Sequence, residues 1–171
     1  MVSEELSVKE VDMGQGISLR CTKCEYSKSF HLGIGMMYSP SAVFDRSYFD
    51  DEKPLLDSLV KSKRIKEQAF SLLKEQFATP TDDYGHEIYY CPHCNELYER
   101  FHFCIIYDGG SYEPEYKCTK CKHLLHRAKV IIEDGEIQLF YTNNKIIDWQ
   151  CPQCGNSKLK QGTATGVLMW D

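Results

Sequence analysis

Cys21-Thr-Lys-Cys24 is the first of four Cys-x-x-Cys pairs in this chain, and these four short stretches decide its fold. The other pairs are Cys91/Cys94, Cys118/Cys121 and Cys151/Cys154. Together they use eight of the nine cysteines, the number that two tetrahedral four-cysteine sites require. Two thiolates on a tight turn can occupy two corners of a tetrahedron, and a second pair supplies the other two. The sequence therefore predicts two structural Zn²⁺ ions.

The composition indicates a globular protein. The chain has 171 residues, of which 42% are hydrophobic and 26% charged, and its formal net charge is -5. Eight thiolates with two Zn²⁺ ions would bring the net charge to about -9. Such a chain is not a general binder of polyanions, so contact with nucleic acid would need a local basic patch.

Location is predicted from the apolar runs and from the first residues. No apolar run approaches the length of a membrane span, and Met1-Val-Ser-Glu-Glu-Leu6 lacks the basic region and apolar core of a signal peptide. We therefore expect no membrane contact and a cytoplasmic location. Thiols stay reduced there, which favours metal ligation over disulfides.

The pattern along the chain predicts an α+β fold that is mainly antiparallel β. Short strands are expected around each Cys pair, and Asp134-Gly135 between two apolar runs indicates a hairpin. Residues 52–77 carry the one helical stretch, as one helix or two, within an insertion at about 50–78. The apolar stretch Gly33–Tyr38 is expected to be a buried loop. The expected strands are 17–20, 26–32, 86–90, 97–107, 112–117, 128–133, 136–141, 146–150 and 166–170.

Three pairings of the Cys motifs are open. Spacing favours a nested arrangement, because the 23 residues between Cys94 and Cys118 are nearest to the usual ribbon spacing of roughly 15–20. Strand logic favours a sequential arrangement, because the hairpin after Cys121 can return the chain to its start. We expect the sequential form, with two units at residues 1–110 and 111–171. Site 1 would then be Cys21, Cys24, Cys91 and Cys94, and site 2 would be Cys118, Cys121, Cys151 and Cys154.

Two phrases carry a resemblance to a family. Cys21-Thr-Lys-Cys24 followed by His31-Leu-Gly-Ile-Gly-Met-Met-Tyr38, and later Tyr89-Tyr-Cys-Pro-His-Cys94, resemble a group of small, largely uncharacterised bacterial zinc-ribbon proteins. The resemblance loosely covers residues 17–154. It implies a first ribbon that is split by a helical insertion and a second ribbon near the C-terminus, and it supports sequential pairing. It implies no particular activity, and the long hairpin within the second ribbon departs from the group.

Catalysis is not expected. Four-cysteine zinc sites leave no open coordination position, and the chain has neither His-Glu-x-x-His nor the zinc deaminase pattern. Cys91-Pro-His-Cys94 is also the redox motif of a periplasmic disulfide oxidase, but that chemistry needs a helix N-terminus, and a β run precedes this pair. Cys104 is expected to be a small buried residue. His123 and His126 could replace cysteines as ligands, although a fourth Cys pair makes them unnecessary.

A basic run at residues 117–129 spans the third Cys pair and contains no acid across thirteen residues. Its side chains could contact phosphates while Tyr112 or Tyr116 stacks on bases, or they could offset the charge of a four-thiolate zinc centre. The leading hypothesis is a non-catalytic binding module or adaptor, which would bind a protein through Gly33–Tyr38 and the helical insertion. The alternatives are nucleic-acid binding through residues 117–129 and a thiol-redox or zinc-sensing role. The candidate contacts to nucleic acid are Lys117, Lys120, Lys122, Arg127 and Lys129.

Overall fold

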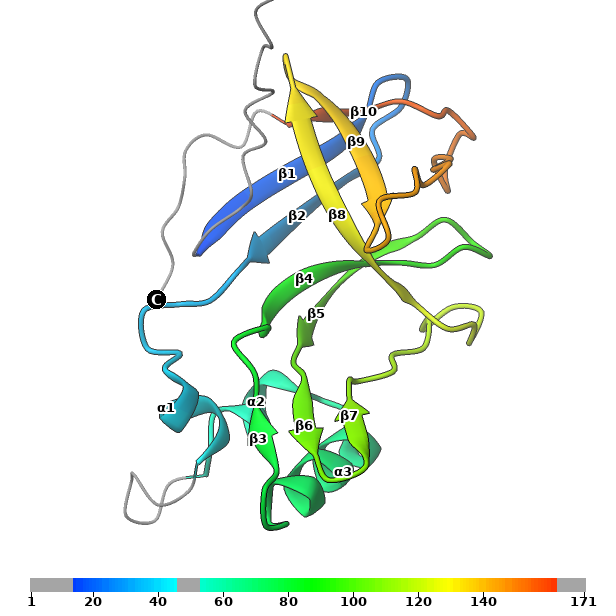
Figure 1. Cartoon of the computed structure of the whole chain (residues 1–171). Coiled ribbons are helices and arrows are strands. Elements are labelled where there is room, and N and C mark those ends of the chain that lie inside the picture. Colours follow the sequence, from blue (N-terminus) through cyan, green and yellow to red (C-terminus); the bar gives the residue numbers. More distant parts are fainter. Residues whose placement is uncertain (1–13, 46–52, 163–171) are drawn as a thin grey trace, which may run out of the picture.

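The computed structural model describes residues 14–45 and 53–162, which form two antiparallel sheets and three helices (Figure 1). The large sheet has seven strands in the order β2-β1-β10-β9-β8-β4-β5, and the small sheet has the order β3-β6-β7. The helices lie beside the small sheet. This confirms the expected class, α+β with mainly antiparallel strands.

The elements have the following bounds. The helices are α1 (Pro40–Phe44), α2 (Leu56–Leu59) and α3 (Lys63–Leu73). The strands are β1 (Gln15–Cys21), β2 (Ser27–Leu32), β3 (Thr79–Pro80), β4 (Gly85–Tyr90), β5 (Leu97–His102), β6 (Ile105–Tyr107), β7 (Gly110–Tyr112), β8 (His126–Glu133), β9 (Glu136–Tyr141) and β10 (Leu159–Gln161).

The expected hairpin is confirmed as β8 and β9. Glu133 pairs with Glu136 across the turn, and Asp134 and Gly135 both have positive φ, 50° and 79°. Two central residues with positive φ are what a tight hairpin turn needs, and Asp-Gly adopts them at low cost.

Other strand predictions are partly wrong. The strand expected at 97–107 is interrupted between His102 and Ile105, and 146–150 forms only an isolated bridge, Phe140 to Ile146. The strand expected at 112–117 is also wrong, because β7 ends at its first residue. The strand expected at 166–170 lies outside the described residues.

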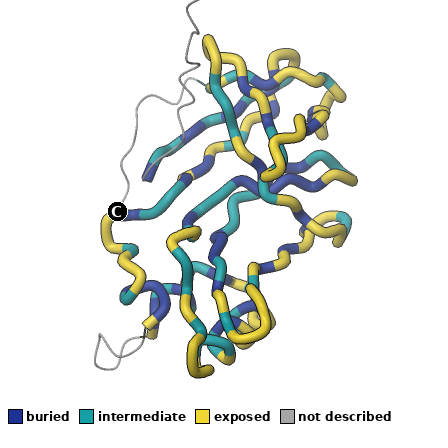
Figure 2. Tube along the Cα trace, viewed as in Figure 1, coloured by how far each residue is buried: buried dark blue, intermediate teal, exposed yellow. Residues whose placement is uncertain are grey.

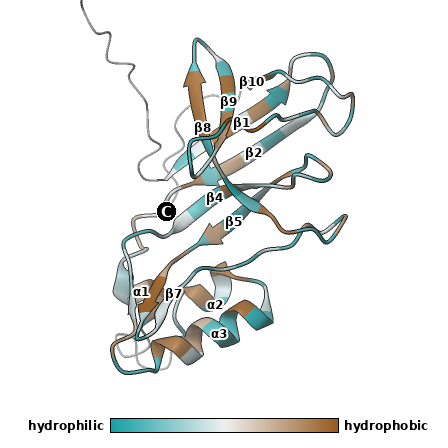
Figure 3. Ribbon diagram, turned by 45° about the vertical axis from the view of Figure 1, so that its right-hand side comes forward, coloured by the Kyte–Doolittle hydropathy of each residue, from teal (hydrophilic) through white to brown (hydrophobic). Residues whose placement is uncertain are grey.

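The predicted helical stretch contains two helices. Ser62 is the N-cap residue of α3, and its hydroxyl accepts a hydrogen bond from the Ile65 amide at 3.4 Å. Ile65 and Ala69 are buried one turn apart, so one face of α3 packs on the core, and its residues alternate in hydropathy in Figure 3. Residues 50–52 of the expected insertion lie outside the described residues.

Two apolar cores lie on opposite sides of β4. Ile88 and Tyr90 belong to the core formed with β1, β2, β9 and β10, whereas Tyr89 belongs to the core beneath the helices and the small sheet. Successive side chains of a strand point to opposite faces, so the second half of β4, from Ile88 to Tyr90, is buried on both faces. Figure 2 shows burial concentrated in the strands and exposure at the turns.

The expected boundary at residue 110 does not separate two sheets. The strands after it, β8, β9 and β10, occupy the middle of the large sheet, and strands from residues 1–110 occupy both ends. Two three-stranded units are visible in this order, β2-β1-β10 and β5-β4-β8, with β9 between them. The second unit is inserted in sequence between the parts of the first.

The loop Gly33–Tyr38 is not buried as predicted. Met36 and Met37 at its tip are 79% and 69% exposed, whereas Gly35 is buried and the other residues of the loop are partly buried. Backbone bonds fix the base of the loop, because Gly33 exchanges amide-to-carbonyl bonds of 2.9 and 2.8 Å with His86. The methionines at the tip have no core to fill. Among the described residues, no helix has the length and apolar character needed to cross a membrane.

Candidate metal centres

The eight paired cysteines gather into two groups, and within each group the sulfur atoms lie within 4.8 Å of one another. The outer cluster is Cys21, Cys24, Cys151 and Cys154. The inner cluster is Cys91, Cys94, Cys118 and Cys121. The predicted ligand residues are therefore brought together, but the predicted sequential pairing is wrong, and the nested pairing is the observed one.

Strand pairing explains the nested arrangement. In each three-stranded unit, the strand that follows the second Cys pair runs antiparallel beside the strand that enters the first. Cys21 on β1 lies opposite Leu159 on β10, and Tyr90 on β4 lies opposite His126 on β8. This register places the two Cys turns of a unit at the same end of the sheet. The spacing of 23 residues between Cys94 and Cys118 was the signal that favoured this result.

The distances between sulfur atoms suit a metal ion and not disulfides. They are 3.5 Å for Cys21–Cys154 and Cys24–Cys151, and 3.4 and 3.5 Å for Cys91–Cys121 and Cys94–Cys118. A disulfide would need about 2.05 Å. A tetrahedral ion with metal–sulfur bonds of about 2.3 Å separates its ligands by about 3.8 Å. Each cluster could therefore hold one tetrahedral ion after small adjustments.

The four Cys turns share one backbone geometry. In each, the amide of the first cysteine donates to the carbonyl five residues later, at 2.7 to 2.9 Å. In three turns the residue after the second cysteine has positive φ, with values of 59° at Asn95, 64° at Lys122 and 76° at Gly155. This tight path turns both sulfur atoms of a pair toward one point. The accepting carbonyls belong to Tyr26, Glu96, His123 and Asn156.

Hydrogen bonds to sulfur favour the thiolate in each cluster. Burial raises the pKa of Cys21, but bonds from the Lys23 amide and the Asn156 side chain, both at 3.4 Å, outweigh it and lower the pKa to about 6. Burial also opposes ionisation of Cys118, but the Tyr98 hydroxyl 3.1 Å away helps to lower its pKa to about 6. These donors prepare both sulfur atoms for a cation.

One further thiol in each cluster, Cys24 in the outer and Cys94 in the inner, has a raised pKa. A bond from the Tyr26 amide favours the thiolate of Cys24, yet burial and the neighbouring thiols raise its pKa to about 12. Burial, together with the adjacent sulfurs, raises the pKa of Cys94 to about 12 as well. Four negative charges cannot share so small a volume without compensation, so full ionisation of either cluster requires a bound cation.

Glu96 links the two clusters, a role that no motif in the sequence indicates. It is 3% exposed, and its carboxylate accepts from the Tyr26 hydroxyl and from Lys120 Nζ, each at 2.6 Å. Burial opposes its ionisation, but Lys120 and Tyr26 outweigh burial and lower its pKa. A second link runs from the Trp149 indole N–H to the Asn95 carbonyl at 3.0 Å. Each link joins a Cys turn of the outer cluster to one of the inner cluster.

The basic run of residues 117–129 does not form one free patch. Lys120 is bonded to Glu96, and Arg127 is 22% exposed and bonded to Glu87 and Asp83. Tyr116 is buried, and its hydroxyl donates to the Phe101 carbonyl at 2.5 Å, so it is not placed to stack on a base. The other exposed members, Lys117, Lys122 and Lys129, make no ion pair that the structure shows among the described residues. Nucleic-acid binding stays a prediction.

The remaining sulfur and imidazole candidates lie beside the clusters or away from them. His123 stacks on His93 with ring centroids 4.0 Å apart, and the inner cluster has four sulfur ligands without it. His126 is exposed and packs edge-on against Tyr141. Cys104 is partly buried between β5 and β6, and burial raises the pKa of its thiol. A raised pKa does not suit a reactive cysteine.

Compared with protein-family models, with curated proteins and with solved structures, the chain matches none of them. The resemblance to zinc-ribbon proteins therefore depends on the Cys motifs and their neighbouring residues alone.

Proposed function

We propose that the protein is a zinc-stabilised, non-catalytic binding module whose partner is another protein. The observation that carries the proposal is the composition of both clusters, four sulfur ligands each. Four thiolates complete the coordination of a tetrahedral Zn²⁺ and leave no position for water or substrate. The two ions then serve to hold the fold together.

The three-stranded units support a description as two zinc ribbons, one inserted into the other. Each unit has two Cys turns at one end of three antiparallel strands. Tetrahedral sulfur sites suit zinc or iron, so the identity of the metal is a question for metal analysis. Free thiols in such numbers suit a reducing compartment, which supports a cytoplasmic location.

The loop Gly33–Tyr38 is the contact surface that we propose. Its methionines are among the most exposed large apolar side chains of the described residues. The loop has a fixed base, because Gly33 is bonded to β4 and the Tyr84 hydroxyl donates to the Tyr38 carbonyl at 2.6 Å. Methionine adapts its shape to an apolar partner, and exposed apolar patches often mark interaction sites.

Affinity capture from the source cell, quantified by mass spectrometry, tests the proposal. The bait is the wild-type chain, the double variant Met36→Ser/Met37→Ser, or the control Ile146→Ser. Ile146 is 64% exposed, so the control removes a comparable apolar side chain elsewhere. We expect one set of proteins to be retained by the wild type and the control and lost with the double variant. Equal retention by all three baits would show that the loop is not the contact surface.

Zinc content is measured on the same preparations. We expect two zinc ions per chain in each bait, because neither substitution touches a ligand. A chain that is stably folded without metal would contradict the structural role of the ions.

A further inference from the structure

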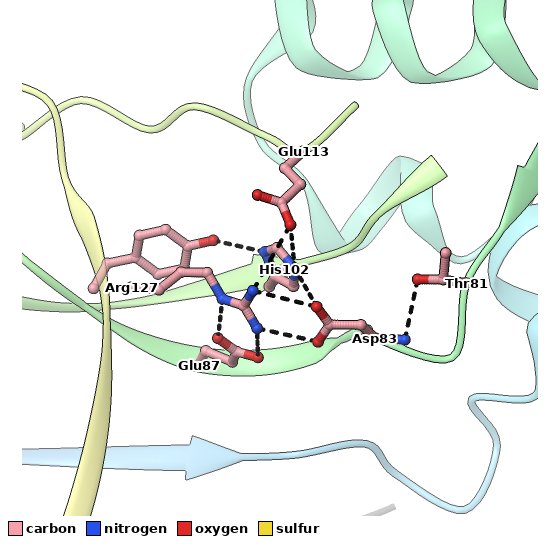
Figure 4. A network of polar contacts seen from close by, with 7 residues as sticks. Thr81, Asp83, Glu87, His102, Glu113 and Arg127 are labelled. Carbon is pink, nitrogen blue, oxygen red and sulfur yellow. Dashed lines mark hydrogen bonds and ion pairs between the residues drawn. The ribbon is translucent and has the colours of Figure 1, made fainter. Parts of the chain in front are cut away.

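A second group of ligand-type side chains lies away from the cysteines (Figure 4). Its centre is His102 at the end of β5, which is 0% exposed. His102 Nε2 lies 3.2 Å from Asp83 Oδ2 and 3.8 Å from Glu113 Oε1. Asp83 precedes β4 and Glu113 follows β7, so the fold brings together residues that no sequence motif connects.

This group borders an open cavity of about 260 Å³. Tyr89, His102, Glu113 and Arg127 are among the polar residues that line it. Leu125 and Tyr141 also line it. The side chains around His102 therefore have access to a space that could hold water or a small ligand.

We propose that Asp83, His102 and Glu113 bind a third metal ion, a divalent cation with nitrogen and oxygen ligands. Their ligand atoms all lie within 4.8 Å of one another. An ion about 2.0–2.2 Å from each atom would separate neighbouring ligands by about 2.9 to 3.6 Å. Asp83 and Glu113 have side chains that are 51% and 53% exposed, so both can rotate slightly to close the site around a fixed imidazole.

Tyr89 fixes the orientation of that imidazole. Its hydroxyl lies 3.1 Å from His102 Nδ1, on the opposite side of the ring from the carboxylates. A hydroxyl can accept from Nδ1–H as well as donate to Nδ1. When it accepts, Nε2 carries the lone pair and faces Asp83 and Glu113. Metal-bound histidines commonly have such a partner on the second ring nitrogen.

The charges around the site favour a divalent ion. Three carboxylates, those of Asp83, Glu87 and Glu113, surround one guanidinium, that of Arg127. With a neutral imidazole, a divalent cation would bring this group to a net charge of zero. Arg127 would keep its two bonds of 2.7 Å to Glu87 and its bond of 3.1 Å to Asp83 Oδ1. The bond of 3.2 Å from Arg127 Nη1 to Asp83 Oδ2 would be given up as that oxygen turned to the metal.

The chemistry of this site differs from that of the cysteine clusters. One imidazole and two carboxylates suit harder ions such as Mn²⁺, whereas thiolates select Zn²⁺. Three protein ligands leave open coordination positions, and two of the three, His102 and Glu113, line the cavity. The site is thus a candidate for exchangeable binding, in contrast to the closed clusters.

Titration of the zinc-loaded full chain with Mn²⁺, followed by electron paramagnetic resonance, tests the proposal. We expect one saturable Mn²⁺ per chain. Asp83→Asn and Glu113→Gln should each weaken binding about tenfold or more. The matched control is Glu115→Gln, which removes an acid that lines the same cavity but lies outside the group, and it should bind like the wild type.

Two results would overturn the proposal. One is the absence of saturable Mn²⁺ binding to the wild type, and the other is unchanged affinity in both Asp83→Asn and Glu113→Gln. Each variant must retain two zinc ions per chain, which confirms that it is folded. The metal site is tested by Mn²⁺ binding, whereas the protein contact is tested by affinity capture with the Met36→Ser/Met37→Ser variant. Either proposal can therefore fail without the other.

Discussion

The nested pairing of the cysteines makes a sharp prediction for two variants that each replace four cysteines by serine. The nested variant replaces the outer cluster and leaves the inner cluster complete. The mixed variant replaces Cys21, Cys24, Cys91 and Cys94, and so leaves half of each cluster. Both changes remove the same number of thiols. We expect the nested variant to bind one zinc ion per chain tightly and the mixed variant to bind none.

The expected magnitude follows from the geometry of the inner cluster. Its sulfur atoms lie 3.4 and 3.5 Å apart across the two Cys turns, close to the spacing in a tetrahedral zinc site. A structural zinc site contributes about 10–16 kcal/mol of apparent binding free energy in small peptides at neutral pH. That is comparable with the whole stability of a domain, about 5–15 kcal/mol. The nested variant should therefore keep β4, β5 and β8 folded around their ion, whereas the mixed variant should lose both units.

Metal analysis and far-ultraviolet circular dichroism in the presence of a competing zinc chelator provide the assay. The nested variant should retain one zinc and a part of the β signal, and the mixed variant should lose zinc and unfold. A mixed variant that binds one zinc tightly while the nested variant binds none would refute the pairing. It would return the assignment to the sequential form.

Three further predictions concern stability, each measured as the free energy of unfolding in urea at fixed zinc. Glu96→Gln should lower the free energy of unfolding by about 2 kcal/mol, because it weakens the charge-assisted bond from Lys120. The exposed control Glu67→Gln should change it by less than about 0.5 kcal/mol, and equal effects of the two variants would exclude the link between the clusters. Gly85→Ala should lower the free energy of unfolding by about 2 kcal/mol, because φ is +155° and the new Cβ would lie 3.0 Å from the Gly33 carbonyl oxygen. Gly135→Ala, which has open space around it, should lower it by about 1 kcal/mol. The reverse order would contradict the close contact between Gly85 and the Gly33 backbone. Tyr116→Phe should lower the free energy of unfolding by about 1 to 3 kcal/mol, because the Phe101 carbonyl loses the hydrogen bond from the Tyr116 hydroxyl. A loss no greater than that of the partly exposed control Tyr107→Phe would show that this bond contributes little.

Several features of the protein could be predicted from the sequence because they depend on neighbouring residues. Two cysteines separated by two residues predict a turn that points both sulfur atoms to one side, and all four pairs form such turns. Asp134-Gly135 predicts a hairpin because its backbone preferences match a two-residue turn. The apolar spacing of residues 52–77 indicates helix, and α2 and α3 lie there.

The sequence did not decide which turns share a cluster. That depends on the pairing of β1 with β10 and of β4 with β8, strands far apart in the chain. The same contacts bury Glu96 between two Cys turns and divert Lys120 and Arg127 to carboxylates. The local pattern suggested a basic surface because it contains no information about distant acids.

The sequence by itself thus determined the ligand residues, the β class and the hairpin, since local spacing and turn chemistry are sufficient for these. Only the tertiary structure decided the nested pairing, the exposed methionine loop and the group around His102. Each of these depends on which strands hydrogen-bond across long separations in sequence, and that choice minimises the free energy of the whole sheet and its two cores, not that of any one segment.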